Sequence, residues 1–546
     1  MQWAGTQGLR SLRRILAVPA RGWSEKPGKP SVVLLIAALA VAAALLLPTT
    51  YLVIRAAGAG LETWELLWRV RILEILVRTL SLIGAVTTAS ILLAVPMAWL
   101  TVRTDLPFRT AWAVLAALPL VIPSYVAGFI VVVALGPRGM LQKMLDGPFG
   151  VDRIPDIYGF PGATLTLTLL SYPYVLLTVR SAFLRMDPSL EEVSRGLGRN
   201  PWATFLGVIL PLLRPAIAAG GLLVALYTLA DFGAVSLLRY ETFTWAIFLQ
   251  YESALDRGLG AVLSLVLVGV ALAIVAGEIL TRGRSRYYRS SPGAARSVVR
   301  VRLGNWRWPA LTFCATLVAA SLILPMSILV FWAVRGIVAG EPLLLLWAAA
   351  RNSLYVSGLA ALAAVVAAMP IATLSVRYPG MLSGLLERTA HIGFALPGIA
   401  IALALVFFGA NYAPILYQTT ALLILAYVVL FISAALGAVR ASLLQVSPNV
   451  EEAARGLGRT PLMVFTSVTL PLVRPGIISG ASLVFLLTMK ELPATLILGP
   501  IGFKTLATSI WSAASEAFFA QAAAPALLLI LVSSAPLAFF MLRERK

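Results

Sequence analysis

The chain has 546 residues, of which 60% are hydrophobic and 12% are charged, whereas soluble globular proteins carry about 25% charged residues. This composition excludes an ordinary soluble protein and indicates a surface that faces lipid. The net charge of +20 is typical of the basic cytoplasmic loops of membrane proteins, so it does not indicate binding to nucleic acid.

Apolar runs of about 20 residues recur along the whole chain and predict membrane-spanning helices. The expected spans are twelve in number: 31–55, 78–102, 110–135, 161–184, 213–238, 258–280, 309–334, 352–376, 386–410, 417–439, 473–498 and 522–541. We interpret the first run as a span and not as a removable signal peptide. The predicted fold class is therefore an all-α polytopic membrane protein with twelve transmembrane helices.

Basic residues gather in three segments: 10–29, 281–307 and 543–546. With twelve spans, all three segments fall on one side of the membrane. Because Lys and Arg are enriched in cytoplasmic loops, this side is predicted to be the cytoplasm. Both chain termini are then expected to be cytoplasmic.

The chain contains one cysteine, Cys314, and one histidine, His391. A single cysteine excludes an intrachain disulfide and a metal site built on several cysteines. We interpret His391 as a packing or capping residue. The sequence thus predicts no metal site and no cofactor bound by this chain.

One polar segment occurs twice in the sequence. The two copies are EEVSRGLGRNPWATFLGVILPLLRP, residues 191–215, and EEAARGLGRTPLMVFTSVTLPLVRP, residues 451–475. Upstream of them VPMAWLTVR (95–103) resembles MPIATLSVR (369–377), and ALPLVIPSYVAG (117–128) more faintly resembles ALPGIAIALAL (395–405). The sequence therefore predicts two parallel six-helix repeats, related by a pseudo-two-fold axis along the membrane normal, with a pathway between them.

Each copy predicts two short helices joined by a bend on the cytoplasmic side. In the second copy the signals are Ser447-Pro448 at the first helix start, Gly456 and Gly458 at its end, Thr460-Pro461 at the second start and Leu470-Pro471 at the second end. The first copy has Asp187-Pro188, Gly196, Gly198, Asn200-Pro201 and Leu210-Pro211 at these places. Such residues are typical of helix starts and ends. A passive cap on the bundle is the alternative, but it would not require the same spacing twice.

The repeated segment resembles the coupling loop of ABC importer permeases, whose pattern is Glu-Ala-Ala, three residues, Gly, nine residues and Ile-x-Leu-Pro. The second copy matches it at Glu452, Ala453, Ala454, Gly458, Leu470 and Pro471, with Val468 in place of Ile. The first copy matches at Glu192, Gly198, Leu210 and Pro211, with Val193 and Ser194 in place of the alanines. The resemblance covers residues 75–541 as two type I permease units.

This resemblance implies an importer in a bacterial or archaeal plasma membrane. Each coupling loop would dock on one of two copies of an ABC ATPase subunit, and an extracytoplasmic solute-binding protein would deliver the substrate. The chain has no GxxxxGK[ST] loop, and residues 499–505 have the wrong spacing. ATP is therefore expected to bind to the partner ATPase subunits, and this chain is expected not to be an enzyme. Membrane lipid is the remaining expected partner.

The resemblance also predicts a division of the chain. Residues 1–74 would hold the N-terminus and first span, 75–280 the first permease unit, 281–308 a basic linker, 309–346 the seventh span and an outer loop, and 347–541 the second unit. Fusion of two units in one chain is similar to ferric iron importers and to thiamine importers. Segments 227–248 and 489–511 resemble ferric iron permeases, so ferric iron is the expected substrate.

The candidate pathway residues are Asp231, Lys490 and Glu491. Carboxylates suit a hard cation, and an ionisable residue in an apolar span indicates function. The alternative is structural, with Glu491 paired to Lys490 or to a neighbouring helix. Thiamine, a polyamine or an inorganic anion stays open as substrate. An ion-coupled secondary transporter is the alternative of another class, but such a protein has no reason to duplicate the coupling loop.

Overall fold

The computed structural model describes residues 30–137, 139–150, 155–186, 189–250, 257–281, 301–340 and 344–543. In these ranges the chain is almost entirely helical, and the β-structure is one isolated bridge between Thr104 and Val301. The basic residues before 30 and after 543, most of the linker, and Asp187-Pro188 lie outside the described residues.

The described helices run in chain order as follows: α2 (Val32–Ala57), α3 (Leu61–Glu65), η1 (Leu66–Trp68), α4 (Val70–Arg103), α5 (Arg109–Leu115), η2 (Leu118–Val121), α6 (Ser124–Leu135), α7 (Met140–Phe149), α8 (Phe160–Arg185), α9 (Ser189–Gly196), α10 (Pro201–Thr204), η3 (Phe205–Ile209), α11 (Leu210–Ala230), α12 (Gly233–Leu237), α13 (Phe243–Leu249), α14 (Arg257–Thr281), η5 (Gly304–Trp306), α15 (Arg307–Val318), η6 (Ala319–Ile323), α16 (Leu324–Val338), α17 (Leu344–Arg377), α18 (Met381–Ala395), α19 (Gly398–Tyr412), α20 (Thr420–Gln445), α21 (Pro448–Gly456), α22 (Pro461–Val464), η7 (Phe465–Thr469), α23 (Leu470–Met489), α24 (Pro493–Leu498), α25 (Leu506–Ser515) and α26 (Phe519–Arg543).

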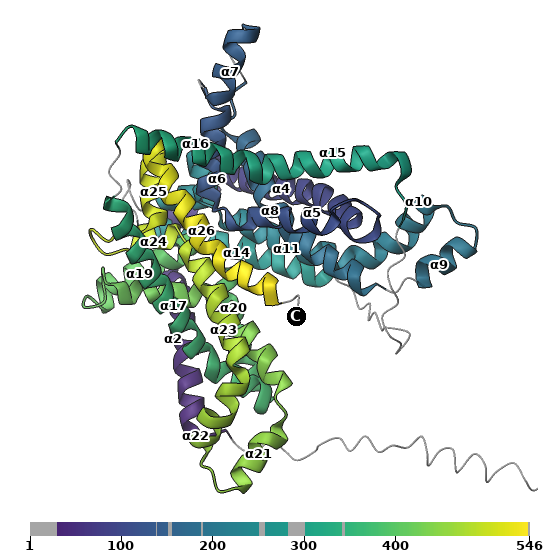
Figure 1. Cartoon of the computed structure of the whole chain (residues 1–546). Helices are drawn as coiled ribbons and strands as arrows, with labels where there is room; N and C mark the ends of the chain where they lie inside the picture. Colours follow the sequence, from purple (N-terminus) through teal and green to yellow (C-terminus); the bar gives the residue numbers. More distant parts are fainter. Residues whose placement is uncertain are drawn as a thin grey trace, which may run out of the picture.

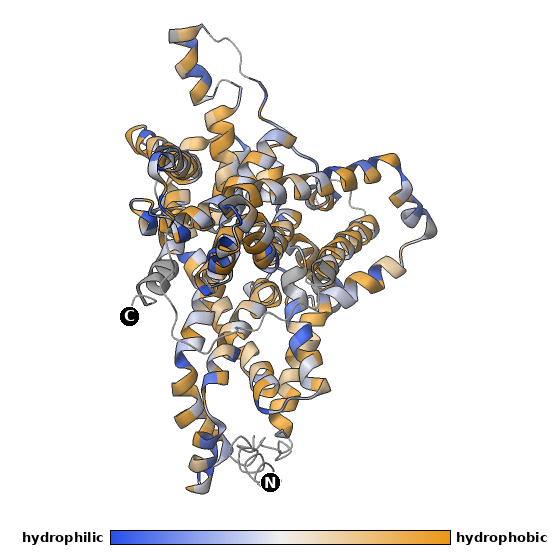
Figure 2. Cartoon of the chain, turned by 90° about the vertical axis from the view of Figure 1, so that its right-hand side faces the viewer, coloured by the Kyte–Doolittle hydropathy of each residue, from blue (hydrophilic) through white to orange (hydrophobic). Residues whose placement is uncertain are grey.

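Hydrophobic residues predominate along these helices (Figure 2). Ten helices in the described ranges are long and apolar enough to cross a membrane, and three shorter apolar helices accompany them. Each expected span overlaps one helix or a series of consecutive helices. This arrangement confirms the all-α polytopic fold class.

Two expected spans are interrupted by proline. The span expected at 110–135 consists of α5, η2 and α6, and the span expected at 386–410 consists of α18 and α19. Pro123 and Pro397 stand at the N-caps of α6 and α19 in extended conformation. Proline disfavours the helical conformation of the residue before it, so each helix ends there and a new one starts.

These prolines also correct the register of the fainter repeat. An offset of 274 residues relates Arg103 to Arg377 and Pro123 to Pro397. The alignment of 117–128 with 395–405, which pairs Pro119 with Pro397, is therefore wrong by four residues. His391 also differs from expectation, since it is exposed within α18 and caps no helix.

The two repeats form two helical arms (Figure 1). In the first arm α4, α8 and α11 pack together, and in the second α17, α20 and α23 do so. The arms diverge toward α9 and α10 in one and toward α21 and α22 in the other (Figure 1). The two copies of the repeated segment thus form the tips of the two arms (Figure 1).

The first span of each repeat packs on the other repeat. Helix α2 contacts α17, α18 and α19 as well as α14. Conversely, α15 shares a hydrophobic core with α4 and α8, where Cys314 Sγ lies 3.4 Å from Met97 Sδ. In η6, the Ser321 hydroxyl hydrogen-bonds that of Tyr172 in α8 at 3.3 Å. The two arms are therefore interlocked as well as joined in one chain.

Candidate coupling loops and pathway

The first loop (residues 189–209) and the second loop (residues 448–469) share one bend. In the second loop the amides of Leu457, Gly458 and Arg459 donate to the last carbonyls of α21, which closes the helix end. Gly458 and its counterpart Gly198 both have φ of +82°. This left-handed conformation is strained for residues that carry a Cβ atom. The expected bend is confirmed, and it lies at these two glycines.

The expected end of the second short helix is wrong. Helix α10 continues through the π turn η3 into α11, so one uninterrupted helix runs from Pro201 to Ala230, and α22, η7 and α23 repeat this arrangement. In the π turn the amide of Leu210 bonds to the carbonyl of Phe205, five residues back. This wider turn precedes Pro211, which has no amide hydrogen to donate. Each loop is thus a direct extension of a membrane span.

A buried ion pair joins each loop to a second span. The side chain of Arg377, at the end of α17, bonds to Glu451 of α21 at 2.9 Å, with exposures of 12% and 10%. Arg103, at the end of α4, bonds to Glu191 of α9 at 3.2 Å, with exposures of 3% and 16%. Neither pair was predicted from the sequence. Their signal was present, because each arginine ends one repeated segment and each glutamate begins another.

The motif residues divide into exposed and buried positions. Glu192, Glu452 and Ala453 are exposed. In the second loop Ala454 and Val464 are both buried. Val464 of α22 corresponds to Thr204 of α10 in the first loop. In the first loop Ser194 replaces this alanine, and its hydroxyl hydrogen-bonds that of Thr204 at 3.1 Å. The polar pair of one loop therefore stands where the other loop has an apolar pair.

Exposed apolar side chains mark the tips of both loops. Leu197 is 78% exposed and Leu457, at the same place in the second loop, is 84% exposed. Leu462 and Met463 add further exposed apolar surface to the second loop. Leucines at the end of an amphipathic helix are suited to a hydrophobic pocket on another protein.

The expected fifth and eleventh spans end earlier than predicted. Helix α11 ends at Ala230 and α23 at Met489, and the short helices α12 and α24 follow. Asp231 Oδ1 accepts hydrogen bonds from the amides of Ala234 and Val235 at 3.1 and 3.2 Å. Glu491 Oε1 accepts one from the amide of Ala494 at 3.1 Å. Both carboxylates thus lie at a break in the helix and cap the helix that follows.

Lys490 does not pair with Glu491 in this structure. Its Nζ donates to the carbonyl of Leu120 in η2, at 2.7 Å, so it joins the second repeat to the first. At the break after α11, the rings of Phe232 and Phe248 lie 6.0 Å from the ring of Trp511 in α25 of the second repeat. The break after α11 and the break after α23 therefore lie close to the contact between the two repeats.

The Glu491 carboxylate is held close against the start of α19. A Cβ atom built on Gly398 would lie 2.6 Å from Glu491 Oε1, so only glycine fits there without a shift. In the first repeat a Cβ atom on Gly233 would lie 2.7 Å from the Cβ of Tyr125 in α6. The short helix after each break thus packs tightly on the helix that follows Pro123 or Pro397.

The carboxylates do not form a ready metal centre. Within the described residues no three His, Cys, Asp or Glu side chains gather in a way that could hold a metal ion. Tyr125 is buried, and its hydroxyl has no hydrogen-bond partner among the described residues. The oxygen-bearing side chains in this region therefore lie apart from one another and are not clustered at one point.

Comparison with known proteins gives two kinds of match. A family described as "Binding-protein-dependent transport system inner membrane component" matches residues 90–285 and again residues 360–544, which confirms two repeated units. The Fe(3+)-transport system permease protein FbpB 2 of Haemophilus influenzae is 37% identical over 524 residues, which cover 95% of this chain and 99% of that protein.

Two further relatives differ in how much of the chain they cover. The ferric transport system permease protein FbpB of Actinobacillus pleuropneumoniae is 25% identical over 500 residues, covering 86% of this chain and 71% of that protein. The molybdenum transport system permease protein ModB of Escherichia coli K12 is 30% identical over 198 residues, covering 35% of this chain and 85% of that protein. The molybdenum protein therefore resembles one stretch of about the length of a single repeat. The ferric proteins resemble a stretch that includes both repeats.

Proposed function

Because the chain belongs to the family of binding-protein-dependent transport system inner membrane components, we propose that it forms the membrane pathway of an importer for ferric iron. The observation that carries this proposal is the similarity over nearly the full length to a protein named for Fe(3+) transport. An inorganic anion is less well supported, because the molybdenum protein matches 35% of this chain. None of the three relatives described above is named for thiamine or a polyamine.

Membership of this family implies partners that the chain does not contain. A solute-binding protein brings the substrate to the membrane, and an ATPase supplies the energy. The finer proposal is that two copies of the ATPase subunit bind, one at each loop. The equal bends at Gly198 and Gly458 support it, because equivalent surfaces bind equivalent partners. ATP then binds to those subunits, and this chain acts as a transport component without enzymatic activity.

The exposed leucines would make the contact with the ATPase. Leu197 and Leu457 stand at the tips of the loops, where a hydrophobic pocket could receive them. Of the motif residues, Glu192 and Glu452 are exposed beside them and would set the polarity of the contact. Ala453 is also exposed and would lie at the contact, whereas Ala454 packs inside the loop.

Two rigid connections would carry the movement of the ATPase into the membrane. The first is the uninterrupted helix through Leu210-Pro211 or Leu470-Pro471 into the fifth span of each repeat. The second is the ion pair of each loop with the end of α4 or α17. A push on one loop would therefore move two spans of the same arm together.

Asp231, Lys490 and Glu491 would lie along the pathway. They stand at the ends of α11 and α23, close to the contact between repeats. Opening that contact would expose both carboxylates, which are hard ligands suited to a ferric ion. Their hydrogen bonds to backbone amides would hold them in place while the cation passes.

The family places the chain in the inner membrane. We extend this to a cytoplasmic position for both loops and for both chain termini, because the three basic segments share one side when twelve spans are counted. The division into 1–74, 75–280, 281–308, 309–346 and 347–541 remains our prediction for the boundaries of the units.

Uptake by the reconstituted complex tests the proposed function. The chain, its ATPase and its binding protein would be placed in proteoliposomes with radioactive ferric iron. We expect uptake that requires ATP and the binding protein, and that molybdate, thiamine and polyamines do not inhibit. Uptake driven by a proton or sodium gradient without the ATPase would instead identify a secondary transporter. Saturable uptake of molybdate without uptake of iron would contradict the substrate.

A further inference from the structure

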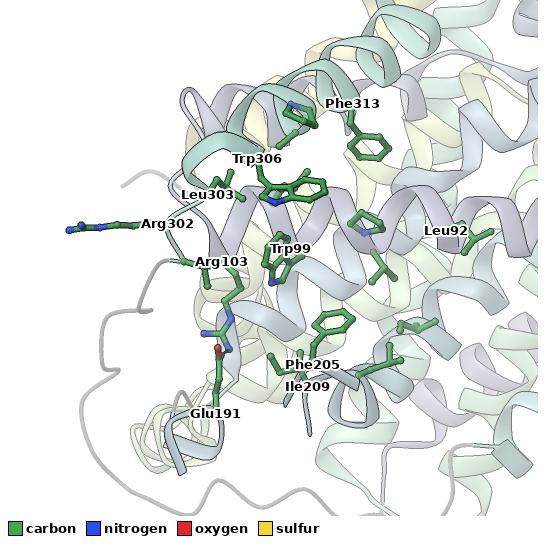
Figure 3. A pocket seen from close by; sticks show the side chains of 18 of the residues that line it. Leu92, Trp99, Arg103, Glu191, Phe205, Ile209, Arg302, Leu303, Trp306 and Phe313 are labelled. Carbon is green, nitrogen blue, oxygen red and sulfur yellow. Dashed lines mark ion pairs between the residues drawn. The ribbon is translucent and has the colours of Figure 1, made fainter. Parts of the chain in front are cut away.

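A groove lies beside the first loop, between α4, the continuous helix of α10 and α11, and the start of α15 (Figure 3). Its volume is about 810 Å³. Most of its wall is apolar, including Leu92, Val95, Phe205, Ile217 and Phe313. Leu92 is 67% exposed, so the groove opens at the outer surface of the helix bundle.

The length of the groove matches one leaflet of a membrane. On α4 the lining residues extend from Ile91 to Arg103, which is a distance of roughly 18 Å at 1.5 Å per helical residue. The hydrocarbon layer of one leaflet is about 15 Å thick. An open apolar groove of one leaflet's length suits the acyl chains of a lipid.

One end of the groove is charged and aromatic. Arg103, Glu191, Arg195 and Arg302 all line it there, which leaves a net positive charge. Arg195 and Arg103 both contact Glu191, and the side chain of Arg302 extends outward at the mouth (Figure 3). Trp306 also lies at this end, and indole rings are enriched where the hydrocarbon layer meets the headgroups.

We propose that this groove binds an anionic phospholipid, with its acyl chains along α4 and α11 and its headgroup phosphate at Arg195 and Arg302. Opposite charge at the polar end and an apolar wall of one leaflet's length support this occupant. The site goes beyond the transport function and does not depend on the substrate. Because Arg195 also bonds to Glu191, the bound lipid stabilises the first loop through contacts that lie next to its ion pair.

Native mass spectrometry of the full-length chain tests the site. The chain would be purified in detergent and titrated with phosphatidylglycerol or phosphatidylcholine. We expect the parent to retain phosphatidylglycerol preferentially. Arg302→Gln should weaken its binding about fivefold, since one basic residue near a headgroup contributes about 1 kcal/mol. Val95→Trp fills the groove and should reduce the binding of both lipids.

Two matched variants serve as controls. Arg307→Gln removes an exposed charge near Arg302 that does not line the groove. Val334→Trp adds the same volume to an exposed position of α16 away from the groove. Both should bind phosphatidylglycerol like the parent. Equal retention of the two lipids by the parent, or unchanged binding in Arg302→Gln and Val95→Trp, would overturn the proposal.

A second measurement needs no substitution that fills the groove or removes a charge from it. Phosphatidylglycerol with brominated acyl chains should quench the fluorescence of Trp99 and Trp306, which both line the groove. The double variant Trp99→Phe/Trp306→Phe should lose this part of the quenching, and brominated phosphatidylcholine should produce less of it in the parent. Equal quenching of parent and double variant would place the lipid elsewhere. Cross-linking of another segment of the chain into the groove would also overturn the proposal.

Discussion

Arg377 at the end of α17 and Glu451 near the start of α21 form an ion pair of 2.9 Å, with the Thr469 hydroxyl donating to the same carboxylate oxygen at 3.0 Å. The pair Arg103 and Glu191 occupies the same place in the other repeat. Each loop is therefore fixed to its arm at two points, by this pair and by the helix that continues into the membrane.

The first prediction concerns this ion pair. Glu451→Ala leaves the buried Arg377 without its partner, so we expect the free energy of unfolding to fall by about 3–5 kcal/mol. A thermal or denaturant melt in detergent would measure it. Adding Arg377→Met removes the unpaired charge and should restore at least half of the loss. The exposed neighbour Glu452→Ala is the control and should change stability by less than about 0.5 kcal/mol.

The second prediction concerns the loop glycines. Gly198→Pro together with Gly458→Pro cannot adopt φ of +82°, because proline fixes φ near −65°. We expect the chain to insert in the membrane but to lose co-purification of the ATPase and uptake of iron. Gly196→Ala with Gly456→Ala is the matched control, since both positions end a helix and have open space for a Cβ atom. Unchanged uptake in the proline variant would show that the loops are passive caps.

The third prediction separates the charge of Asp231 from its capping role. Asparagine caps a helix about as well as aspartate, so Asp231→Asn should keep the stability of the parent, whereas Asp231→Ala should cost about 1 kcal/mol. If the carboxylate lines the pathway, both variants lower iron uptake while ATP hydrolysis by the complex continues. Normal uptake by Asp231→Asn would leave the residue a purely structural role. Glu491→Gln and Glu491→Ala apply the same comparison to the second repeat.

The fourth prediction concerns the contact between Gly398 and Glu491. Gly398→Ala places a methyl group 2.6 Å from the present position of Glu491 Oε1, so the carboxylate has to move. We expect a lower melting temperature and reduced iron uptake. Gly384→Ala in α18 has open space around the new methyl group and should stabilise the helix slightly. Equal behaviour of the two variants would contradict the close contact.

The fifth prediction concerns orientation. Single cysteines at Arg199 and Arg459, in a Cys314→Ala background, should react with a membrane-impermeant reagent only when it is supplied from the cytoplasmic side. Both positions are exposed on the loops. Labelling of either position from the outside alone would require a different number of spans.

The sequence predicted the features that depend on hydropathy and repetition. Apolar runs placed the spans, and the duplicated segment located both loops and the bend at Gly198 and Gly458. It did not predict that two spans end at Asp231 and Glu491, because the residues beyond them are again apolar and hydropathy averages over such breaks. The ion pairs were also missed, since Arg377 and Glu451 are separated by 74 residues and meet only in the folded structure.

The exchange of first spans constrains how the protein is made. Helix α2 is synthesised early, but its partners α17, α18 and α19 follow some 300 residues later. The core of α4 and α8 likewise waits for α15. Neither arm can therefore complete its packing before the other has emerged from the ribosome. Because the two repeats are fused in one chain, the unpacked helices of each repeat are held at high local concentration near the other repeat. Each helix therefore packs on its own chain and not on a neighbouring one.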